Sequence, residues 1–397
     1  MKTALYVHVP FCLRRCTYCD FNTYAGLLEL RVAYVAALEQ ELALWAAEQP
    51  DLEATTLYFG GGTPSLLTPG QVGTIIAAVR RHFALPEGAE VTLEANPGTV
   101  TLSSLAGLRR VGVNRLSLGV QSADAEELRL LGRIHTWEEA VAAVRAARQA
   151  GFDNLSLDLI FGLPGQTLPR WEQTLARVLA LEPEHLSLYA LTLEPGTPLA
   201  EQVARGELPE PDSDLAAEMY ECASRRLLEA GFWQYEISNW ARGTERAPAL
   251  WALPSGGRSE GCGPWVSHHN LAYWRMEPWL GVGAGAYSYL PGSRWHNLLH
   301  PADYSAALQA GRSCRVDVEP ISRTLLLGET LMMGLRLAEG VTDARFRALF
   351  GAGLETVYGE VLARYAALGL LEWDGRRVRL TARGRLLGNQ VFGAFLL

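Results

Sequence analysis

The stretch Cys12-Leu-Arg-Arg-Cys16-Thr-Tyr-Cys19-Asp-Phe21 places three cysteines within eight residues, directly behind an apolar, strand-like run at residues 4–11. Cysteine thiolates in a tight run are ligands for soft metal centres. A structural zinc site normally takes four protein ligands, and no second cysteine pair follows here; His8 is a conceivable fourth ligand, but it lies inside the strand-like run. Three cysteines would leave one iron of a 4Fe–4S cluster open to bind a substrate or cofactor directly.

Length and composition describe a globular chain with more than one part. A chain of 397 residues is too long for one ordinary compact core, although this length would fit an α/β barrel with a small appendage. No apolar run reaches the roughly 18–20 residues needed to span a bilayer, and removing a signal peptide would remove the three cysteines. The net charge of −8 disfavours broad nucleic-acid binding. The scattered Cys222, Cys262 and Cys314 are unlike a disulfide framework, so we expect a reducing, cytoplasmic setting.

Strand-like and helical patterns alternate up to about residue 240. We expect strands at 3–9, 55–60, 90–95, 115–120, 154–160 and 185–191, with a weaker one at 234–238. We expect helices at 27–48, 69–83, 101–110, 136–150, 168–180 and 212–230. We interpret the strands as continuously apolar, which is typical of parallel strands covered on both faces. Six or seven such βα units predict an α/β fold, a partial barrel that does not close.

The remaining chain breaks this rhythm. Residues 241–265 are rich in glycine, proline and charge and predict a loop, and an aromatic- and histidine-rich segment follows at 268–297. Helical runs at 323–338, 342–350 and 354–368 precede Asp374-Gly375, which predicts a type I′ hairpin. We therefore expect a barrel domain at 1–240, a loop insertion at 241–300 and a C-terminal helical, winged-helix-like domain at 301–397.

Polar residues stand at or just after the ends of successive predicted strands. Thr56-Leu-Tyr-Phe-Gly-Gly-Gly-Thr-Pro64 ends the second, and its glycines allow close approach of a ligand to the backbone. Glu94, Gln121 and Asp158 mark the following strands, and Arg133 lies in a connecting segment. Any one of these could merely cap a helix or tie a loop. Together they predict a site at the carboxyl ends of the strands, where barrel enzymes place their chemistry.

The spacing C-x3-C-x2-C behind the first strand, followed by these motifs in order, resembles the radical S-adenosylmethionine (SAM) superfamily. That resemblance implies a 4Fe–4S cluster on Cys12, Cys16 and Cys19, with SAM on the open iron, reductively cleaved to a 5′-deoxyadenosyl radical. It implies SAM contacts from Tyr6, Tyr18, Gly61, Gly62, Thr63, Glu94, Gln121, Arg133 and Asp158.

Over essentially the full chain, the motifs resemble the porphyrin-related branch of that superfamily. This branch holds oxygen-independent coproporphyrinogen III dehydrogenases (oxidases) and HemW-type heme chaperones. The dehydrogenase pattern is C-x3-C-x2-C-x-C, and Phe21 stands at the position of its extra cysteine. The dehydrogenases also carry a long arm before the cluster, whereas here eleven residues precede Cys12. The segment from His269 to Trp274 matches the chaperone motif HNxxYW, which implies a heme site at His269, Asn270, Tyr273 and Trp274.

The resemblance thus implies a heme chaperone with three cofactors: a 4Fe–4S cluster, SAM and heme. We expect its partners to be heme-accepting proteins such as respiratory cytochromes, and no nucleic acid. Coproporphyrinogen III dehydrogenase activity, in porphyrin biosynthesis, is the alternative. The sequence leaves open whether SAM is cleaved in turnover, whether His268 replaces His269 as heme ligand, and whether the protein touches a membrane surface.

Overall fold

Two compact units make up the described part of the chain. The computed structural model describes residues 1–243 and 265–396. The barrel unit comprises Met1–Ala223 and Pro278–Glu319, and the C-terminal unit comprises Ser224–Glu277 and Pro320–Leu397. Cys262 and most of the loop predicted at 241–265 lie outside the described residues.

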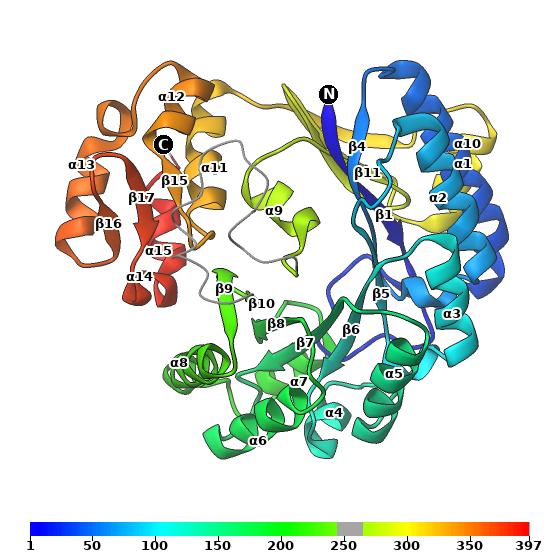
Figure 1. The fold of residues 1–397 in the computed structure, drawn as a ribbon, viewed down its shortest axis with the longest axis horizontal. Coiled ribbons are helices and arrows are strands. Elements are labelled where there is room, and N and C mark those ends of the chain that lie inside the picture. Colours follow the sequence, from blue (N-terminus) through cyan, green and yellow to red (C-terminus); the bar gives the residue numbers. More distant parts are fainter. Residues whose placement is uncertain (244–264, 397) are drawn as a thin grey trace. The chain divides into compact units, whose positions relative to one another are not determined.

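Parallel strands alternating with helices form the larger part of the barrel unit (Figure 1). The strands pair side by side in chain order: β1 Lys2–Val9, β4 Glu53–Gly61, β5 Val91–Ala95, β6 Arg115–Gln121, β7 Leu155–Phe161 and β8 His185–Ala190. The helices that follow them are α1 Arg31–Glu48, α2 Pro69–Phe83, α3 Leu102–Val111, α4 Ala125–Leu130, α5 Trp137–Gln149, α6 Leu168–Leu179, α7 Pro198–Ala204 and α8 Ser213–Glu229. The predicted α/β fold with an open sheet is confirmed, and these strands and helices agree with the predicted ranges to within a few residues, apart from the short α4 and α7.

The strands are not continuously apolar, and this expectation was wrong. Leucines alternate with polar residues, as in β6 with Arg115, Leu116, Ser117 and Leu118, yet both faces are buried. Because successive side chains point to opposite faces of a strand, one face of the sheet is apolar and the other is buried but polar. The polar face carries the candidate site.

A second group of strands extends the sheet beyond β1. β11 Trp279–Val282 runs parallel to β1, and β12 Tyr287–Leu290, β13 Ser293–Asn297 and β14 Arg315–Pro320 follow it in the sheet order. Helix α10 Pro301–Gln309 packs against α1, which Figure 1 shows in yellow beside blue. The sheet is therefore mixed. Residues 278–319 belong to the barrel unit, so the predicted boundaries at 240 and 300 do not match the units.

The C-terminal unit combines two short strands, several helices and a small sheet. β9 Phe232–Glu236 and β10 Asn239–Arg242 are antiparallel, and α9 is His268–Trp274. The remainder is α11 Arg323–Gly334, β15 Val341–Thr342, α12 Asp343–Phe350, α13 Leu354–Ala367, β16 Leu371–Trp373, β17 Arg377–Leu380, α14 Ala382–Leu386 and α15 Gly388–Gly393. Its core is made of buried residues between Leu331 and Phe395.

The hairpin predicted at Asp374-Gly375 is confirmed, but its turn type is wrong. The Asp374 N–H donates to the Arg377 carbonyl at 3.4 Å, so the central residues of the turn are Gly375 and Arg376. A type I′ turn needs positive φ at both, and here Gly375 has φ +80° while Arg376 is not among the residues with positive φ. The Asp374 carboxylate instead accepts the backbone N–H groups of Arg376 and Arg377, at 2.8 and 2.7 Å.

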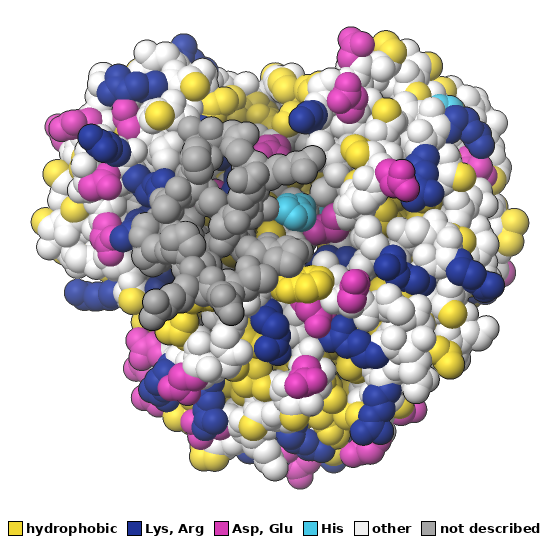
Figure 2. Space-filling model, viewed as in Figure 1, with side chains coloured by type: hydrophobic (Ala, Val, Ile, Leu, Met, Phe, Trp, Pro, Cys, Tyr) yellow, Lys and Arg dark blue, Asp and Glu magenta, His cyan; other side chains and the backbone are white. Residues whose placement is uncertain are grey.

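On the surface, acidic and basic side chains are interspersed over the face shown in Figure 2. Among the described residues, no helix is both long and apolar enough to cross a membrane.

Candidate functional site

The polar face of the sheet brings residues from neighbouring strands into register. Tyr6 of β1 lies beside Tyr58 of β4, and Glu94 of β5 lies beside Ser117 of β6. Asp158 of β7 lies beside Ser187 of β8. Because the strands are parallel, all of these side chains belong to one continuous surface.

Glu94 is a buried carboxyl group held by a tyrosine. The Tyr58 hydroxyl donates to Glu94 Oε1 at 2.7 Å. Burial raises the pKa of Glu94 to about 7, opposed by the Tyr58 hydrogen bond and reinforced by nearby Asp158. Glu94 can therefore gain or lose a proton near neutral pH, and it favours a cationic partner when ionised.

Asp158 is surrounded by hydroxyl groups. Ser117 Oγ donates to its two oxygens at 2.9 and 3.1 Å, and Ser156 Oγ donates at 3.1 Å. Burial raises its pKa, while hydrogen bonds from Ser187 and Ser117 and the charge of Arg115 oppose that rise. This carboxyl group is fixed in place by three serines on three strands.

The cysteine loop is tied to the segment after α4. Arg133 Nη1 approaches Cys16 Sγ at 3.3 Å and the Tyr18 hydroxyl at 3.5 Å, and Arg133 Nη2 donates to the carbonyl of Gly119 at 2.7 Å. Thr17 Oγ1 donates to the carbonyl of Leu130 at 2.7 Å. Arg133 thus joins the loop to β6.

The glycines at the end of β4 allow close packing against the first strand and the residues after it. A Cβ atom at Gly61, which has φ +111°, would lie 2.5 Å from the His8 ring, and one at Gly62 would lie 2.8 Å from the carbonyl oxygen of Phe11. Thr63 follows, and its hydroxyl donates to Cys12 Sγ at 3.5 Å. This segment therefore lies directly against the cysteine loop.

The three cysteines lie within electrostatic range of one another. Burial raises the pKa of the Cys12 thiol; the Thr63 hydrogen bond lowers it, and Cys19 and Cys16 raise it again. No three His, Cys, Asp or Glu side chains of the described residues converge on one metal ion. A cubane cluster does not require such convergence, because each of its cysteines ligates a different iron.

Buried polar atoms without partners test whether a cofactor fits here. Gln121 Oε1, Arg133 Nε and Arg115 Nε are buried and make no hydrogen bond. Gln121 also has φ +67°, a strained value for a residue other than glycine. Unsatisfied buried groups and backbone strain gather at ligand sites. The residues present therefore fit a polar, charged cofactor beside a cysteine-bound cluster.

The sequence-predicted SAM residues come together on this surface, but their supporting partners were missed. Tyr58, Ser117 and His8 contact Glu94, Asp158 and Tyr6, in that order, and the carbonyl oxygen of Asn22 contacts His8. The alternation of polar and leucine residues along the strands was the signal that could have found Tyr58, His8 and Ser117. Nothing local in the sequence marks Asn22.

The predicted heme residues lie on the short helix α9. His269 is 1% exposed, and its Nε2 is 3.0 Å from the Tyr273 hydroxyl. The guanidinium of Arg336 lies over the Trp274 ring at 4.5 Å, and Trp274 Nε1 is buried without a hydrogen-bond partner. His268 is exposed. The helix brings His269 and Tyr273 together and leaves His268 exposed to solvent. Asn270 lies between His269 and Tyr273 in the sequence.

Comparisons with known proteins place this chain in a family. A model of the radical SAM superfamily matches residues 6–178, and one of the HemN C-terminal domain matches residues 321–387. Heme chaperone HemW of Bacillus subtilis (strain 168) is 37% identical, over 100% of this chain and 99% of its own. Radical S-adenosyl methionine domain-containing protein 1, mitochondrial, of Mus musculus is 38% identical, over 96% and 85%.

The fold agrees with these relatives. Coproporphyrinogen III oxidase (HemN) from Escherichia coli, a radical SAM enzyme, superposes with a TM-score of 0.83 and 26% identity, over 99% of this chain and 90% of that one. Sequence similarity over the full length and the matching fold lead to one conclusion: the chain belongs to the HemW family of the radical SAM superfamily.

Proposed function

We propose that this protein is a heme chaperone that holds a 4Fe–4S cluster, SAM and heme, and passes heme to other proteins such as respiratory cytochromes in the cytoplasm. The observation that carries the proposal is the full-length similarity to the heme chaperone HemW. Phe21 supports it, because a 62% exposed phenylalanine stands where the dehydrogenase pattern has a further cysteine.

The barrel unit supplies the residues for cluster and SAM. Cys12, Cys16 and Cys19 would hold the cluster. Glu94, Asp158, Gln121 and Arg133, with Tyr6, Tyr18 and Gly61–Thr63, would line the SAM site. When bound, cluster and SAM together supply one-electron reductive chemistry.

The chain's own residues orient and charge this site. Glu94, fixed by Tyr58, offers a carboxylate to a cationic group, and the Arg133 guanidinium offers positive charge beside Cys16. The buried position of these groups strengthens both interactions, because the surrounding dielectric is low.

Helix α9 supplies the residues for heme. Imidazole ligates iron, and aromatic rings pack against a porphyrin. Because His269 Nε2 is hydrogen-bonded to Tyr273, ligation through that nitrogen requires Tyr273 to release it. His268 is exposed and is the second candidate ligand.

Heme titration of the anaerobically reconstituted protein tests the proposal. We expect a saturable Soret shift for the wild type and a roughly ten-fold weaker affinity for His269→Ala, since one iron ligand is lost. Tyr273→Phe should retain binding, because the aromatic ring is kept and the imidazole Nε2 loses a competing hydrogen bond. His82→Ala, a histidine of α2 in the barrel unit, is the matched control.

Two results would reject the heme site. If His269→Ala and His268→Ala both bind heme as the wild type does, helix α9 does not ligate heme. If the wild type gives no Soret shift with the cluster in place, the protein is not a heme chaperone.

A second candidate function rests on the fold shared with coproporphyrinogen III oxidase. This activity would convert coproporphyrinogen III to protoporphyrinogen IX by radical decarboxylation. An anaerobic assay with SAM and a reductant decides between the two: formation of protoporphyrinogen would favour the enzyme over the chaperone.

A further inference from the structure

The cysteine loop is fastened to the barrel unit by a residue that carries no cofactor chemistry. Asn22 follows Cys19 by three positions. Its Nδ2 donates to the carbonyls of Ala284 and Leu299, at 3.1 and 2.9 Å, and its Oδ1 accepts the Tyr24 hydroxyl at 3.0 Å. Both polar atoms of the side chain are therefore used, and Nδ2 ties the end of the loop to a segment more than 260 positions away.

The backbone of Asn22 is held as well. His8 Nε2 lies 2.9 Å from the Asn22 carbonyl oxygen, and His8 Nδ1 lies 3.0 Å from the Tyr6 hydroxyl. Because a carbonyl oxygen can only accept, Nε2 carries the ring proton and Nδ1 accepts from Tyr6. Burial lowers the pKa of His8, which keeps the ring in this neutral form.

The partner of Asn22 is a tight turn at residues 283–286, which we call the anchor turn. Gly283 has φ +101° and Gly285 has φ +74°. A Cβ atom at Gly285 would lie 2.3 Å from Asn22 Nδ2. The turn can therefore approach the asparagine only because residue 285 is glycine.

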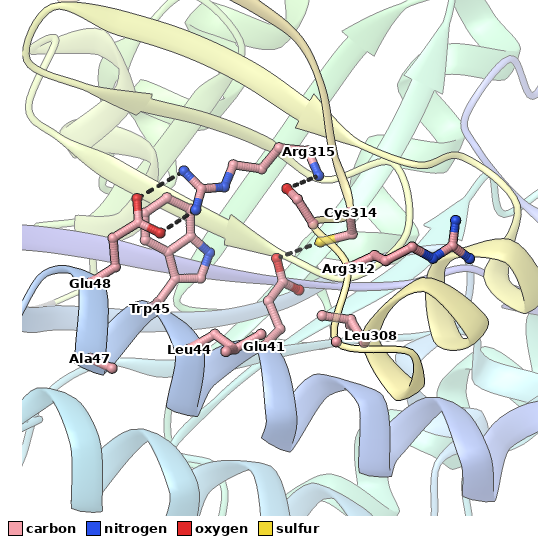
Figure 3. A pocket seen from close by; sticks show the side chains of 11 residues that line it. Glu41, Leu44, Trp45, Ala47, Glu48, Leu308, Arg312, Cys314 and Arg315 are labelled. Carbon is pink, nitrogen blue, oxygen red and sulfur yellow. Dashed lines mark hydrogen bonds and ion pairs between the residues drawn. The ribbon is translucent and has the colours of Figure 1, made fainter.

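A buried carboxyl group fixes the other side of the anchor turn. Glu41 of α1 accepts the N–H of Gly283 at 2.8 Å, the Asn297 amide at 2.7 Å and the Tyr304 hydroxyl at 2.5 Å. Figure 3 shows Glu41 reaching from its helix toward Cys314, whose thiol lies 3.5 Å from Oε1. Glu41 is 2% exposed, so the turn is anchored inside the unit.

A tyrosine of the same helix joins the anchor turn to β1. The Tyr34 hydroxyl accepts the N–H of Ala284 at 2.7 Å and donates to the His8 carbonyl at 2.8 Å. The turn, β1 and the cysteine loop thus share one network of buried hydrogen bonds. Such a network is rigid when all of its members are satisfied.

We propose that Asn22 is a positioning residue for the cluster: it clamps the cysteine loop to the anchor turn, which Glu41 holds in place. Groups behind the ligands of a metal site orient those ligands, and their loss typically costs ten- to a hundred-fold in metal affinity. The inference rests on the proposed cluster site and goes beyond it, since Asn22 is neither a cluster ligand nor one of the predicted SAM contacts.

The rate at which cluster iron is lost to a chelator, under anaerobic conditions, tests the clamp. We expect Asn22→Ala to lose iron about ten-fold faster than the wild type and to change the electron paramagnetic resonance signal of the reduced cluster. Asn22→Asp should behave alike, because it keeps the size of the side chain and loses both donors; it replaces the alanine variant if that one does not fold.

Asn114→Ala is the matched control. Asn114 also bridges backbone groups, donating to the Ala89 carbonyl at 2.7 Å and accepting the Val91 N–H at 2.8 Å, but at the opposite ends of the strands. We expect it to lower thermal stability comparably and to leave iron loss and the spectrum unchanged.

A double-mutant cycle isolates the contact itself. Gly285→Ala should speed iron loss more in the wild type than in Asn22→Ala, because its Cβ would lie 2.3 Å from Asn22 Nδ2 and alanine at position 22 lacks that atom. Additive effects would overturn the clamp, as would equal iron loss in Asn22→Ala and the wild type. A wild type that assembles no cluster would overturn the proposed cofactor site as well, so the two failures are distinguishable.

Discussion

At the scale of single residues, the site depends on carboxyl groups that are buried and yet satisfied. Glu94 receives a hydrogen bond from Tyr58, and Asp158 receives hydrogen bonds from three serines. Arg115, whose burial is nearly complete, lowers the pKa of both carboxyl groups. Burial outweighs these contacts, so both carboxyl groups bind protons more tightly in the folded state than in water.

Glu94 makes stability depend on pH in a defined direction. Its pKa rises from 4.5 to about 7 on folding. Its contribution to the free energy of unfolding is therefore fully present below pH 4.5 and is lost as the pH rises through 7. We expect the stability of cofactor-free wild type relative to Glu94→Gln to fall by about 3 kcal/mol across this window. Denaturant unfolding at several pH values measures the difference.

The exposed Glu87 provides the comparison. Glu87→Gln should leave the unfolding free energy within about 0.5 kcal/mol of the wild type, because surface substitutions away from special features cost little. A wild type that gains stability relative to Glu94→Gln as the pH rises would contradict the assigned environment of Glu94.

The sequence predicts the reactive residues better than the residues that support them. Cys12, Cys16 and Cys19 are recognisable because a local spacing reflects a local loop. Asn22 is not, since two of its partners, Ala284 on the anchor turn and Leu299, are more than 260 positions away and the turn becomes a neighbour only when β11 joins β1. Long-range pairing of this kind leaves no periodic signal in the chain.

At the scale of elements, helix caps give a direct test of local sequence signals. Thr136 accepts the N–H of Glu139 at 3.2 Å, and Glu139 accepts the N–H of Thr136 at 2.7 Å, which forms a capping box at the start of α5. We expect Thr136→Ala to cost about 1 kcal/mol in unfolding free energy, measured by chemical denaturation.

Thr167 is the matched control, because it begins α6 without a side-chain cap bond and is likewise exposed. Thr167→Ala should change stability by less than about 0.5 kcal/mol. Equal losses in the two variants would show that the cap bond is not the source of the effect.

Elements with a local pattern were predicted, and those defined by distant pairing were not. Helix α5, with its cap, its apolar face and Gly151 at its end, agrees with the prediction to within a residue at each end. Strands β11 to β13 were missed because they are short and because β11, to which β12 and then β13 are added, pairs with β1 from the other end of the chain. The alternation in β6 and β7 was overlooked, although leucine and polar residues take turns at the start of both strands.

At the scale of the whole molecule, each unit has a hydrophobic core of its own. Leu118 on β6 is completely buried in the barrel unit. Phe346, Tyr358 and Phe395 pack together in the C-terminal unit, with ring centroids of Phe346 and Tyr358 6.2 Å apart. Units with separate cores need not unfold in one step.

We therefore expect core substitutions to act on one unit at a time. Phe346→Ala should destabilise the C-terminal unit by about 3–5 kcal/mol, and Leu118→Ala should destabilise the barrel unit by about 2–5 kcal/mol, because each leaves a cavity in a packed core.

Native-state hydrogen exchange, read by mass spectrometry peptide by peptide, reports the two units separately. Phe346→Ala should speed exchange in peptides from 331–395 and leave β4 to β7 protected, and Leu118→Ala should do the reverse. Faster exchange throughout the chain in both variants would mean that the units unfold as one, since each core would then depend on the other.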